Sequence, residues 1–228
     1  MVGELTATIA HEINQPLVGV VTNANAATRW LAATPPNLDE ARQAVHRIAR
    51  DGNRASEVIK RIRAFIKKGE PAKMPLDLND LIQETVALTQ AELARKKVSL
   101  QTELSPELPR VPADHIQLQQ VLLNLVVNAL DSMTAVAGQP RCLRIRTDRL
   151  EPDTVQIAVQ DTGVGIKPAE TAHLFEPFYT TKPNGLGLGL AISRSIVEAH
   201  GGRLWATPNN GRGVTFQLTL PVQDGGAS

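Results

Sequence analysis

The hydrophobic positions between residues 38 and 66 follow a heptad repeat. Apolar side chains recur there at alternating spacings of three and four residues, and Gly52 is the one position that interrupts the apolar set. This heptad seam consists of Leu38, Ala41, Val45, Ile48, Gly52, Ala55, Ile59, Ile62 and Ile66. A repeat sustained over about four heptads is typical of a long helix in a bundle or a coiled coil.

A second, less regular apolar stripe precedes the heptad seam and predicts a helix over residues 2–33. Residues 34–37, Thr-Pro-Pro-Asn, separate the two segments, and the two prolines must end a helix there. Asp39 and Glu40 then suit the first turn of the next helix. The pattern predicts an antiparallel helical hairpin. Because one hairpin cannot bury so long a seam, we expect two copies to form a dimeric four-helix bundle.

The pattern changes after residue 68, where a glycine and two prolines in residues 69–75 indicate a linker. Beyond it, segments with helical periodicity are mixed with segments in which apolar and polar residues alternate. The predicted helices span residues 79–95, 113–136 and 191–200, and the predicted strands run through residues 98–104, 143–147, 155–159 and 214–220. These elements predict a sheet covered on one face by helices.

The whole chain is therefore expected to be an α+β protein, in which a helical hairpin is followed by an α/β two-layer sandwich. We place the hairpin domain at residues 1–70, a linker at 71–75, the second domain at 76–222 and a tail at 223–228.

Composition excludes several classes of function. The 24 Lys and Arg residues nearly balance the 23 Asp and Glu residues, so no global positive field attracts nucleic acid. Aromatic residues make up 3% of the chain, which is too few for a surface that stacks single-stranded bases. The single cysteine, Cys142, excludes a disulfide framework and a thiolate zinc site. We therefore expect no nucleic-acid partner.

The chain also lacks the sequence signals of membrane insertion and secretion. No run of 18 uncharged apolar residues occurs, and the N-terminus lacks the pattern of a signal peptide. We expect a cytoplasmic location and no membrane contact for this segment. Because a motif-bearing helix follows Met1 almost at once, we also expect the chain to be part of a longer sensor, whose parent protein can be anchored in a membrane.

Two groups of glycines lie where phosphate-binding loops commonly lie. Gly163 and Gly165 follow a predicted strand, and Gly185, Gly187 and Gly189 precede a predicted helix. Neither group has the spacing of a Walker A loop or a Rossmann fingerprint. A turn is the simpler explanation of the first pair. Three alternating glycines at a helix start favour an anion bound by backbone N–H groups.

Polar side chains form one stripe on the predicted helix at residues 113–136. Spacings of three and four residues place Gln117, Gln120, Asn124, Asn128 and Asp131 on one face. Solvated helix faces are usually rich in Lys and Glu, whereas this stripe consists mostly of amides, whose oxygens suit Mg²⁺. From the stripe alone, a solvated face and a metal-binding face explain the pattern equally well.

The first predicted helix contains an unusual segment at residues 11–16, His-Glu-Ile-Asn-Gln-Pro. It is not a zinc-binding HExxH motif, because Gln15 occupies the place of the second histidine. Pro16 cannot donate to the carbonyl of Glu12, so we expect a kink and an exposed carbonyl beside His11. A lone helical histidine is more often structural than catalytic, but a proline that strains the same turn favours a function.

Six motifs together resemble, in order, the transmitter core of two-component sensor histidine kinases. The H-box resembles residues 11–17 (HEINQPL), the N-box residues 124–128 (NLVVN), the first glycine box residues 161–166 (DTGVGI), the F-box residues 175–182 (FEPFYTTK), the second glycine box residues 185–190 (GLGLGL) and the last glycine box residues 211–216 (GRGVTF). The resemblance implies a dimerisation and histidine-phosphotransfer hairpin. It also implies an ATP-binding domain of the Bergerat type found in gyrase and mismatch-repair ATPases.

The resemblance also implies roles for individual residues. His11 would accept the phosphoryl group, Glu12 would hold the Nδ1–H of its ring, Asp161 would bind the adenine amino group, and Asn128 would be the Mg²⁺ ligand with Asn124 nearby. Lys182 and the glycines after it would form a lid over the phosphates, and Thr215 would line the adenine site. The other nucleotide-binding positions implied are Asp131, Gly163, Gly165, Ile166, Phe175, Thr181, Gly185, Leu186, Gly187, Leu188, Gly189 and Leu190.

The activity implied by the resemblance is ATP-dependent phosphorylation of His11, followed by transfer to an aspartate on the receiver domain of a response regulator. The expected partners are a second copy of the chain and that receiver domain. Gln15 stands where the family often has Thr or Asn in phosphatase activity. Two roles are equally open for Gln15: orienting a water molecule towards a phosphoaspartate, or bonding the carbonyl exposed by Pro16.

Three other interpretations of the sequence compete with this one. A degenerate kinase would bind nucleotide and dimerise without transferring a phosphoryl group, but the intact His11, Asn128 and Asp161 disfavour it. A different ATPase or a Ser/Thr kinase on the same fold is disfavoured by the hairpin that bears His11. Nucleic-acid binding rests only on the basic residues 60–68, which a solvated helix face or a surface for an acidic partner explains better.

Overall fold

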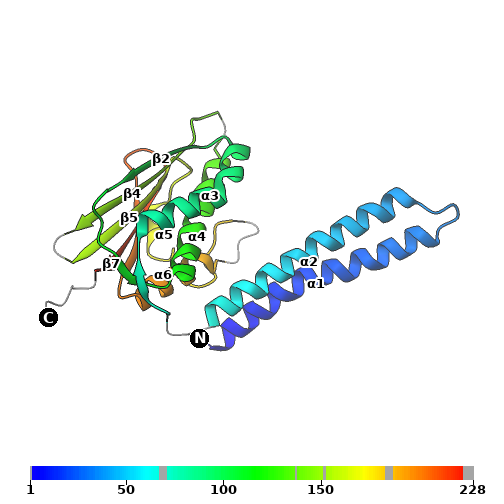
Figure 1. Cartoon of the computed structure of the whole chain (residues 1–228). Coiled ribbons are helices and arrows are strands. Elements are labelled where there is room, and N and C mark those ends of the chain that lie inside the picture. Colours follow the sequence, from blue (N-terminus) through cyan, green and yellow to red (C-terminus); the bar gives the residue numbers. More distant parts are fainter. Residues whose placement is uncertain (1, 67–70, 137, 151–152, 183–186, 223–228) are drawn as a thin grey trace. The chain divides into compact units, whose positions relative to one another are not determined.

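The computed structural model describes residues 2–66, 71–136, 138–150, 153–182 and 187–222. The chain forms two compact units (Figure 1), one containing the N-terminal helices and one comprising residues 69–179 and 189–228. No helix in the described part of the chain is long and apolar enough to cross a membrane.

The first unit contains two long helices packed side by side in an antiparallel hairpin (Figure 1). The helix α1 (Val2–Ala32) continues through Pro16 as one element, and α2 (Leu38–Ile66) begins with Asp39 and Glu40 in its first turn. The predicted hairpin is therefore confirmed, and its two helices end within one residue of the predicted bounds.

A single hairpin buries only part of the heptad seam, as expected of a seam that needs a second copy to cover it. Ala41 and Ala55 are buried, together with Ala44 and Val58, which the seam did not include. In contrast, Leu38, Val45 and Ile59 are exposed by 65%, 54% and 41%. The reason is geometric, because one neighbouring helix covers one line of a helix and leaves the adjacent line uncovered.

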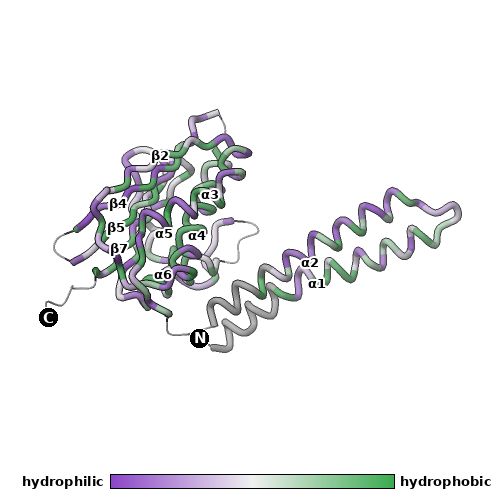
Figure 2. Tube along the Cα trace, viewed as in Figure 1, coloured by the Kyte–Doolittle hydropathy of each residue, from purple (hydrophilic) through white to green (hydrophobic). Residues whose placement is uncertain are grey.

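Apolar side chains are exposed on α1 as well, among them Leu17, Val21 and Leu31. Figure 2 shows hydrophobic positions alternating with hydrophilic ones along both helices. A single hairpin therefore leaves apolar side chains on both helices in contact with water.

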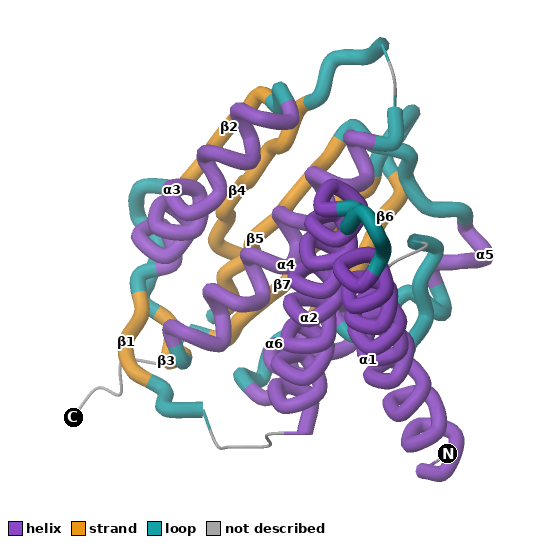
Figure 3. Tube along the Cα trace, turned by 90° about the vertical axis from the view of Figure 1, so that its right-hand side faces the viewer, coloured by secondary structure: helices purple, strands orange, loops and turns teal. Residues whose placement is uncertain are grey.

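The second unit is a five-stranded sheet with helices on one of its faces (Figures 1 and 3). The strand order is β2-β4-β5-β7-β6, with β2 parallel to β4 and the other neighbours antiparallel. The strands are β2 (Ser99–Leu104), β4 (Cys142–Leu150), β5 (Thr154–Asp161), β6 (Arg203–Pro208) and β7 (Val214–Pro221). The helices are α3 (Leu78–Lys96), α4 (His115–Thr134), the short α5 (Pro168–Thr171) and α6 (Gly189–Ala199). The predicted two-layer α/β sandwich is confirmed.

The core of this unit lies between the sheet and α3, α4 and α6, as the alternating strand pattern predicted. Val155, Ile157 and Val159 of β5 point into it, and Leu125 of α4 is completely buried there. The same alternation sends the polar residues of the strands to the opposite, open face of the sheet.

Three strands were not predicted. β6 was missed altogether, and β1 (Met74–Leu76), which overlaps the predicted linker, pairs with β3 (Val111–Ala113), where no strand was predicted. Proline argued against strands there, because it cannot donate a ladder hydrogen bond. In the structure Pro75 lies opposite Pro112 in an isolated two-stranded ribbon, where a missing N–H is tolerated.

Candidate functional site

Asp161 is the most buried acidic side chain described in the structure, with 1% of its surface exposed. It is the last residue of β5 and continues the row of alternate, inward-facing residues on that strand, so its side chain points towards the helices. Its Oδ1 accepts hydrogen bonds from the backbone N–H of Gly163 at 2.8 Å and from Ser132 Oγ at 3.0 Å. The fixed carboxylate is thus a preorganised acceptor for a ligand's N–H group.

Burial is the largest influence on the pKa of Asp161, and it raises that pKa above the ordinary value of 3.8. Hydrogen bonds from the backbone of Gly163, from the Ser132 hydroxyl and from the backbone of Val214 act in the opposite direction but do not cancel it. The folded protein therefore holds the Asp161 proton to a higher pH than the unfolded chain does. Asp161 therefore makes its whole contribution to the free energy of unfolding below pH 3.8, and this contribution is lost as the pH rises through the pKa of the folded protein.

Asp161→Asn is expected to remove this loss in the ligand-free protein. The variant should match the wild type in free energy of unfolding at low pH and exceed it at pH 7, because no buried charge forms. Urea unfolding at a series of pH values measures the difference. A difference that does not change with pH would show that ionisation of Asp161 is not opposed by burial.

Three glycines allow the segments around Asp161 to pack closely. Gly213 has a φ of +84°, and a Cβ there would overlap the carbonyl oxygen of Asp161. Gly165 has a φ of +73° and lies against the backbone of Gly213, while a Cβ on Gly163 would overlap Ser132. The turn explanation of Gly163 and Gly165 is therefore incomplete, since both glycines also let backbone segments meet beside a buried carboxylate.

Asn209 is a structural residue of the site that the sequence analysis missed. Its Nδ2 donates to the carbonyl oxygens of Asp161 at 2.9 Å and Arg212 at 3.1 Å, and its backbone N–H donates to Gly213 at 3.2 Å. It thereby ties the turn before β7 to the end of β5. The run Pro-Asn-Asn-Gly at residues 208–211 is a turn signal that could have indicated it.

Thr215 does not lie where the resemblance implied. It alternates along β7 with the buried Val214 and Phe216, so it faces the open side of the sheet, opposite to Asp161. Its Oγ1 donates to Asn209 Oδ1 at 2.6 Å. The residue of β7 whose backbone bonds Asp161 is Val214. The strand alternation thus corrects the assignment of Thr215 to the adenine site.

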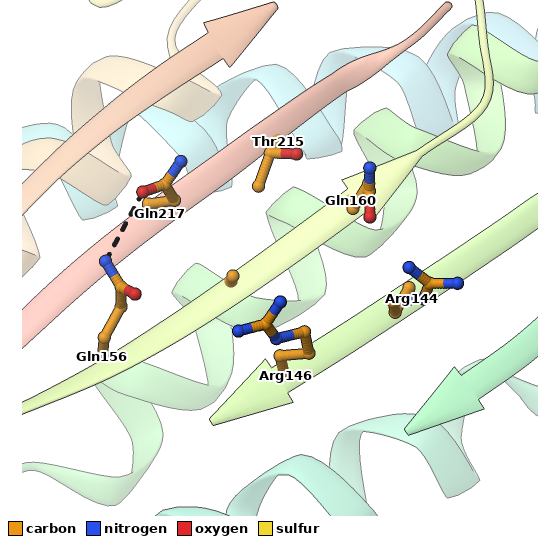
Figure 4. Close-up of a pocket in the computed structure, with 7 residues that line it drawn as sticks. Arg144, Arg146, Gln156, Gln160, Thr215 and Gln217 are labelled. Carbon is orange, nitrogen blue, oxygen red and sulfur yellow. Dashed lines mark hydrogen bonds between the residues drawn. The ribbon is translucent and has the colours of Figure 1, made fainter. Parts of the chain in front are cut away.

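A shallow cavity of about 270 Å³ lies on the open face of the sheet (Figure 4). Polar side chains from β4, β5 and β7 line it. Gln156 of β5 donates a hydrogen bond to Gln217 of the neighbouring β7 at 3.4 Å. Because the sheet separates it from the Asp161 carboxylate, this cavity is not part of the candidate site.

The amide stripe on α4 meets the start of α6. Asn124 Nδ2 donates to Ser193 Oγ at 2.9 Å, and a Cβ on Gly189 would crowd the Asn124 amide. Asn128 follows one turn later, with its Nδ2 3.5 Å from Asn124 Oδ1. A purely solvated face is therefore wrong for Asn124, which packs against a second helix.

Asp131 lies at the other end of the stripe and forms an ion pair with Lys96, whose Nζ is 2.8 Å from Asp131 Oδ1. This pair links α4 to α3 and gives the Asp131 carboxylate a structural partner in addition to any nucleotide contact.

The predicted F-box and lid residues are described only in part. Ile166 and Phe175 pack against the core, and Arg194 lies 5.5 Å from the centre of the Phe175 ring. Lys182 donates its backbone N–H to Thr180 Oγ1 at 3.1 Å next to Thr181, and Gly187 has a φ of +64°. Leu188 is buried and Leu190 packs on the core. Gly185 and Leu186 lie outside the described residues.

The predicted catalytic residues all lie on α1. His11 and Glu12 are in the helix, but their side chains lie outside the described part of the structure. Gln15 is exposed.

A metal ion at this site would need oxygen ligands from a bound molecule. Among the described residues, no group of three or more His, Cys, Asp or Glu side chains could hold a metal. The side-chain oxygens of Asn124 and Asn128 fit Mg²⁺, which commonly takes one or two protein oxygens and completes its shell with phosphates and water.

Two family models match the chain. Residues 1–71 match the His Kinase A (phospho-acceptor) domain, and residues 113–224 match the family of histidine kinase-, DNA gyrase B- and HSP90-like ATPases.

Similar proteins include two sensor kinases. The chain is 41% identical over 221 residues to the sensor histidine kinase TmoS of Ectopseudomonas mendocina, covering 96% of this chain and 23% of TmoS. It is also 41% identical over 223 residues to the sensor protein FixL of Bradyrhizobium diazoefficiens, covering 97% of this chain and 44% of FixL. The chain thus spans less than half the length of these relatives.

The chain is also similar to solved structures of histidine kinases. The catalytic domain of histidine kinase ThkA is 33% identical with a TM-score of 0.59, over 65% of this chain and 95% of that domain. ThkA in complex with response regulator protein TrrA has a TM-score of 0.75 at 27% identity, over 96% of this chain and 61% of that one. ShkA in complex with AMPPNP has a TM-score of 0.69 at 25% identity, over 96% of this chain and 45% of that one.

Proposed function

This chain belongs to the two-component sensor histidine kinases, and from that premise we propose that it is an ATP-dependent autokinase. It phosphorylates His11 and passes the phosphoryl group to an aspartate of a response regulator. The observation that carries the proposal is the buried, preorganised Asp161 carboxylate beside Gly163 and Gly213, in a chain whose first helix bears the phosphoacceptor motif.

Asp161 recognises the nucleotide base in this proposal. Its carboxylate accepts a hydrogen bond from the adenine amino group, and a donor of that kind favours the ionised carboxyl. Nucleotide binding therefore opposes the effect of burial and lowers the pKa of Asp161. Gly163 and Val214 hold the carboxylate in place through their backbone N–H groups.

Asn124 lies against the start of α6, Asn128 follows one turn later on α4, and both would hold Mg²⁺ together with the nucleotide phosphates. The ion would offset the negative charge of the phosphates. The backbone N–H groups at the start of α6 add positive potential there, and Gly189 leaves them uncovered because it has no side chain.

The chemical step forms a bond from a ring nitrogen of His11, Nε2 in our proposal, to the γ-phosphorus and breaks the bond from that phosphorus to the bridging oxygen of ADP. The chain's residues act by positioning the reactants and neutralising charge, which supply most of the catalysis in phosphoryl transfer. Glu12 accepts a hydrogen bond from Nδ1–H and fixes the tautomer in which Nε2 carries the lone pair.

The direct test is incubation of the chain with Mg²⁺ and radiolabelled ATP, followed by a panel of receiver domains. We expect an acid-labile, base-stable label on the chain that then moves to a receiver. A chain that binds AMPPNP but takes no label would be a degenerate kinase, and acid-stable label would indicate a Ser/Thr kinase.

Gln15 is proposed to orient water for dephosphorylation of the regulator, because it lies one helical turn after His11. Gln15→Ala should slow the decay of the regulator's phosphoaspartate by about tenfold while His11 phosphorylation continues. Decay is followed with ADP present and absent. Unchanged decay would leave Gln15 with a structural role.

The functional unit is proposed to be a homodimer in which the uncovered apolar line of the hairpin packs against that of a second copy. Val45 and Ile59 lie on this line and are exposed in one chain. Pairing two hairpins would bury both side chains in a four-helix bundle.

Val45→Glu should therefore give monomers, because the dimer would have to bury an unpaired charge at a cost of several kcal/mol. Gln43→Glu adds the same charge two residues away at an exposed position and is the matched control. Light scattering measures the mass of each. A Val45→Glu protein that stays as dimeric as the control would place the interface elsewhere.

A further inference from the structure

His200 is a buried histidine that the proposed reaction does not use, with 2% of its surface exposed just after the end of α6. Its Nδ1 lies 2.8 Å from the carbonyl oxygen of Ile196, and its Nε2 lies 2.9 Å from the backbone nitrogen of Asp114. A carbonyl can only accept and a backbone N–H can only donate. Nδ1 therefore donates to Ile196, and Nε2 accepts from Asp114.

Asp114 is the residue that precedes α4, and its carboxylate accepts two further hydrogen bonds. Its Oδ1 accepts from the backbone N–H of Gln117 at 3.1 Å and caps the helix. Its Oδ2 accepts from the backbone N–H of Ala72 at 3.1 Å. Ala72 lies between the end of α2 and the start of β1 in the sequence. One residue thus bonds the linker, α4 and, through His200, α6.

The two joined helices carry the proposed phosphate and metal residues. Asn124 lies ten residues after Asp114, about 15 Å along α4, and it is bonded there to Ser193 of α6. The helices are therefore tied at two levels. The Asp114–His200 bond is one tie, and the second lies where Gly189 meets Asn124. We expect a change at the first tie to alter how α6 is held against α4, and thereby to move the N-terminus of α6 relative to Asn124.

We propose that Asp114 and His200 are positioning residues that form a junction through which the linker sets the nucleotide affinity of the site. The inference rests on the proposed ATP-binding function. The effect of the junction depends on its hydrogen bonds and not on packing alone, because each bond requires a donor or an acceptor at a defined atom.

Two substitutions of His200 separate its two bonds. The amide of Asn can take the place of Nδ1 and keep the bond to Ile196, but it is too short to reach Asp114. The amide of Gln can reach the place of Nε2 and accept from Asp114. We expect His200→Asn to weaken binding of AMPPNP with Mg²⁺ by about tenfold, and His200→Gln to stay within about threefold of the wild type. Equal losses in the two variants, or no loss in either, would overturn the proposal.

The linker bond is tested by Asp114→Ser, which keeps a capping hydroxyl for Gln117 but removes the acceptor for Ala72. We expect a loss of about threefold in AMPPNP affinity, and no further loss when the change is added to His200→Asn, because both changes break the same path. Additive losses would show that the linker does not act through His200.

Further measurements separate a positioning role from a loss of folding. Autophosphorylation should show a raised KM for ATP with kcat at saturating ATP nearly unchanged, and urea unfolding should show all variants folded at the assay temperature. A fall in kcat without a change in KM contradicts the proposal. A wild-type chain that does not bind AMPPNP contradicts the proposed function itself, whereas a wild type that binds alongside indistinguishable variants contradicts only the junction.

Discussion

His11→Gln is expected to abolish autophosphorylation of the chain and to leave its affinity for AMPPNP within about twofold of the wild type. The reason is that the phosphoacceptor lies on α1, while the carboxylate and amides proposed to bind nucleotide belong to β5 and α4. Glutamine keeps a polar side chain in the helix but lacks a nucleophilic ring nitrogen. The measurement is incorporation of labelled phosphate together with nucleotide titration.

The matched control is His46→Gln, which makes the same change at an exposed position of α2. It should phosphorylate at the wild-type rate. Label that persists on the His11→Gln protein, or that disappears from the His46→Gln protein instead, would assign the phosphoacceptor to a different residue.

Gly213→Ala is expected to have the second largest effect, reducing nucleotide affinity by at least about tenfold. The new methyl group would overlap the Asp161 carbonyl and approach the Asp161 carboxylate, which therefore has to move. The positive φ of +84° adds backbone strain of about 1–2 kcal/mol. Isothermal titration with AMPPNP and urea unfolding measure the two effects.

Gly138→Ala is the control that separates the backbone strain of a positive φ from the overlap of a new Cβ with neighbouring atoms. Gly138 also has a positive φ, of +70°, but a Cβ there would meet no atom within 4 Å. This control should lose about as much stability as the backbone strain predicts and keep its nucleotide affinity. If Gly213→Ala and Gly138→Ala bind nucleotide equally well, the close packing around Asp161 is unnecessary for binding.

The positions of the helices and strands along the chain could be predicted from the sequence, because they depend on interactions between residues that are close in the sequence. The prolines at residues 35 and 36 end α1, and the heptad spacing predicts α2 to within its observed bounds. The alternation of Val155, Ile157 and Val159 predicts both β5 and the face on which it is buried. The motifs around residues 124, 161 and 189 indicated the family, and the structure brings Asn124 and Gly189 into contact.

Tertiary structure decided what depends on neighbours that lie far away in the sequence. Which half of the heptad seam is covered depends on where α1 packs, so Ala41 is buried while Val45 is exposed. Thr215 and Asp161 belong to adjacent strands, and the burial of Val214 and Phe216 on either side of Thr215 shows that the sheet separates the two side chains. The Asp114–His200 bond joins residues 86 positions apart. No local pattern specifies such a bond, because its two partners meet only when the sheet and its helices have packed.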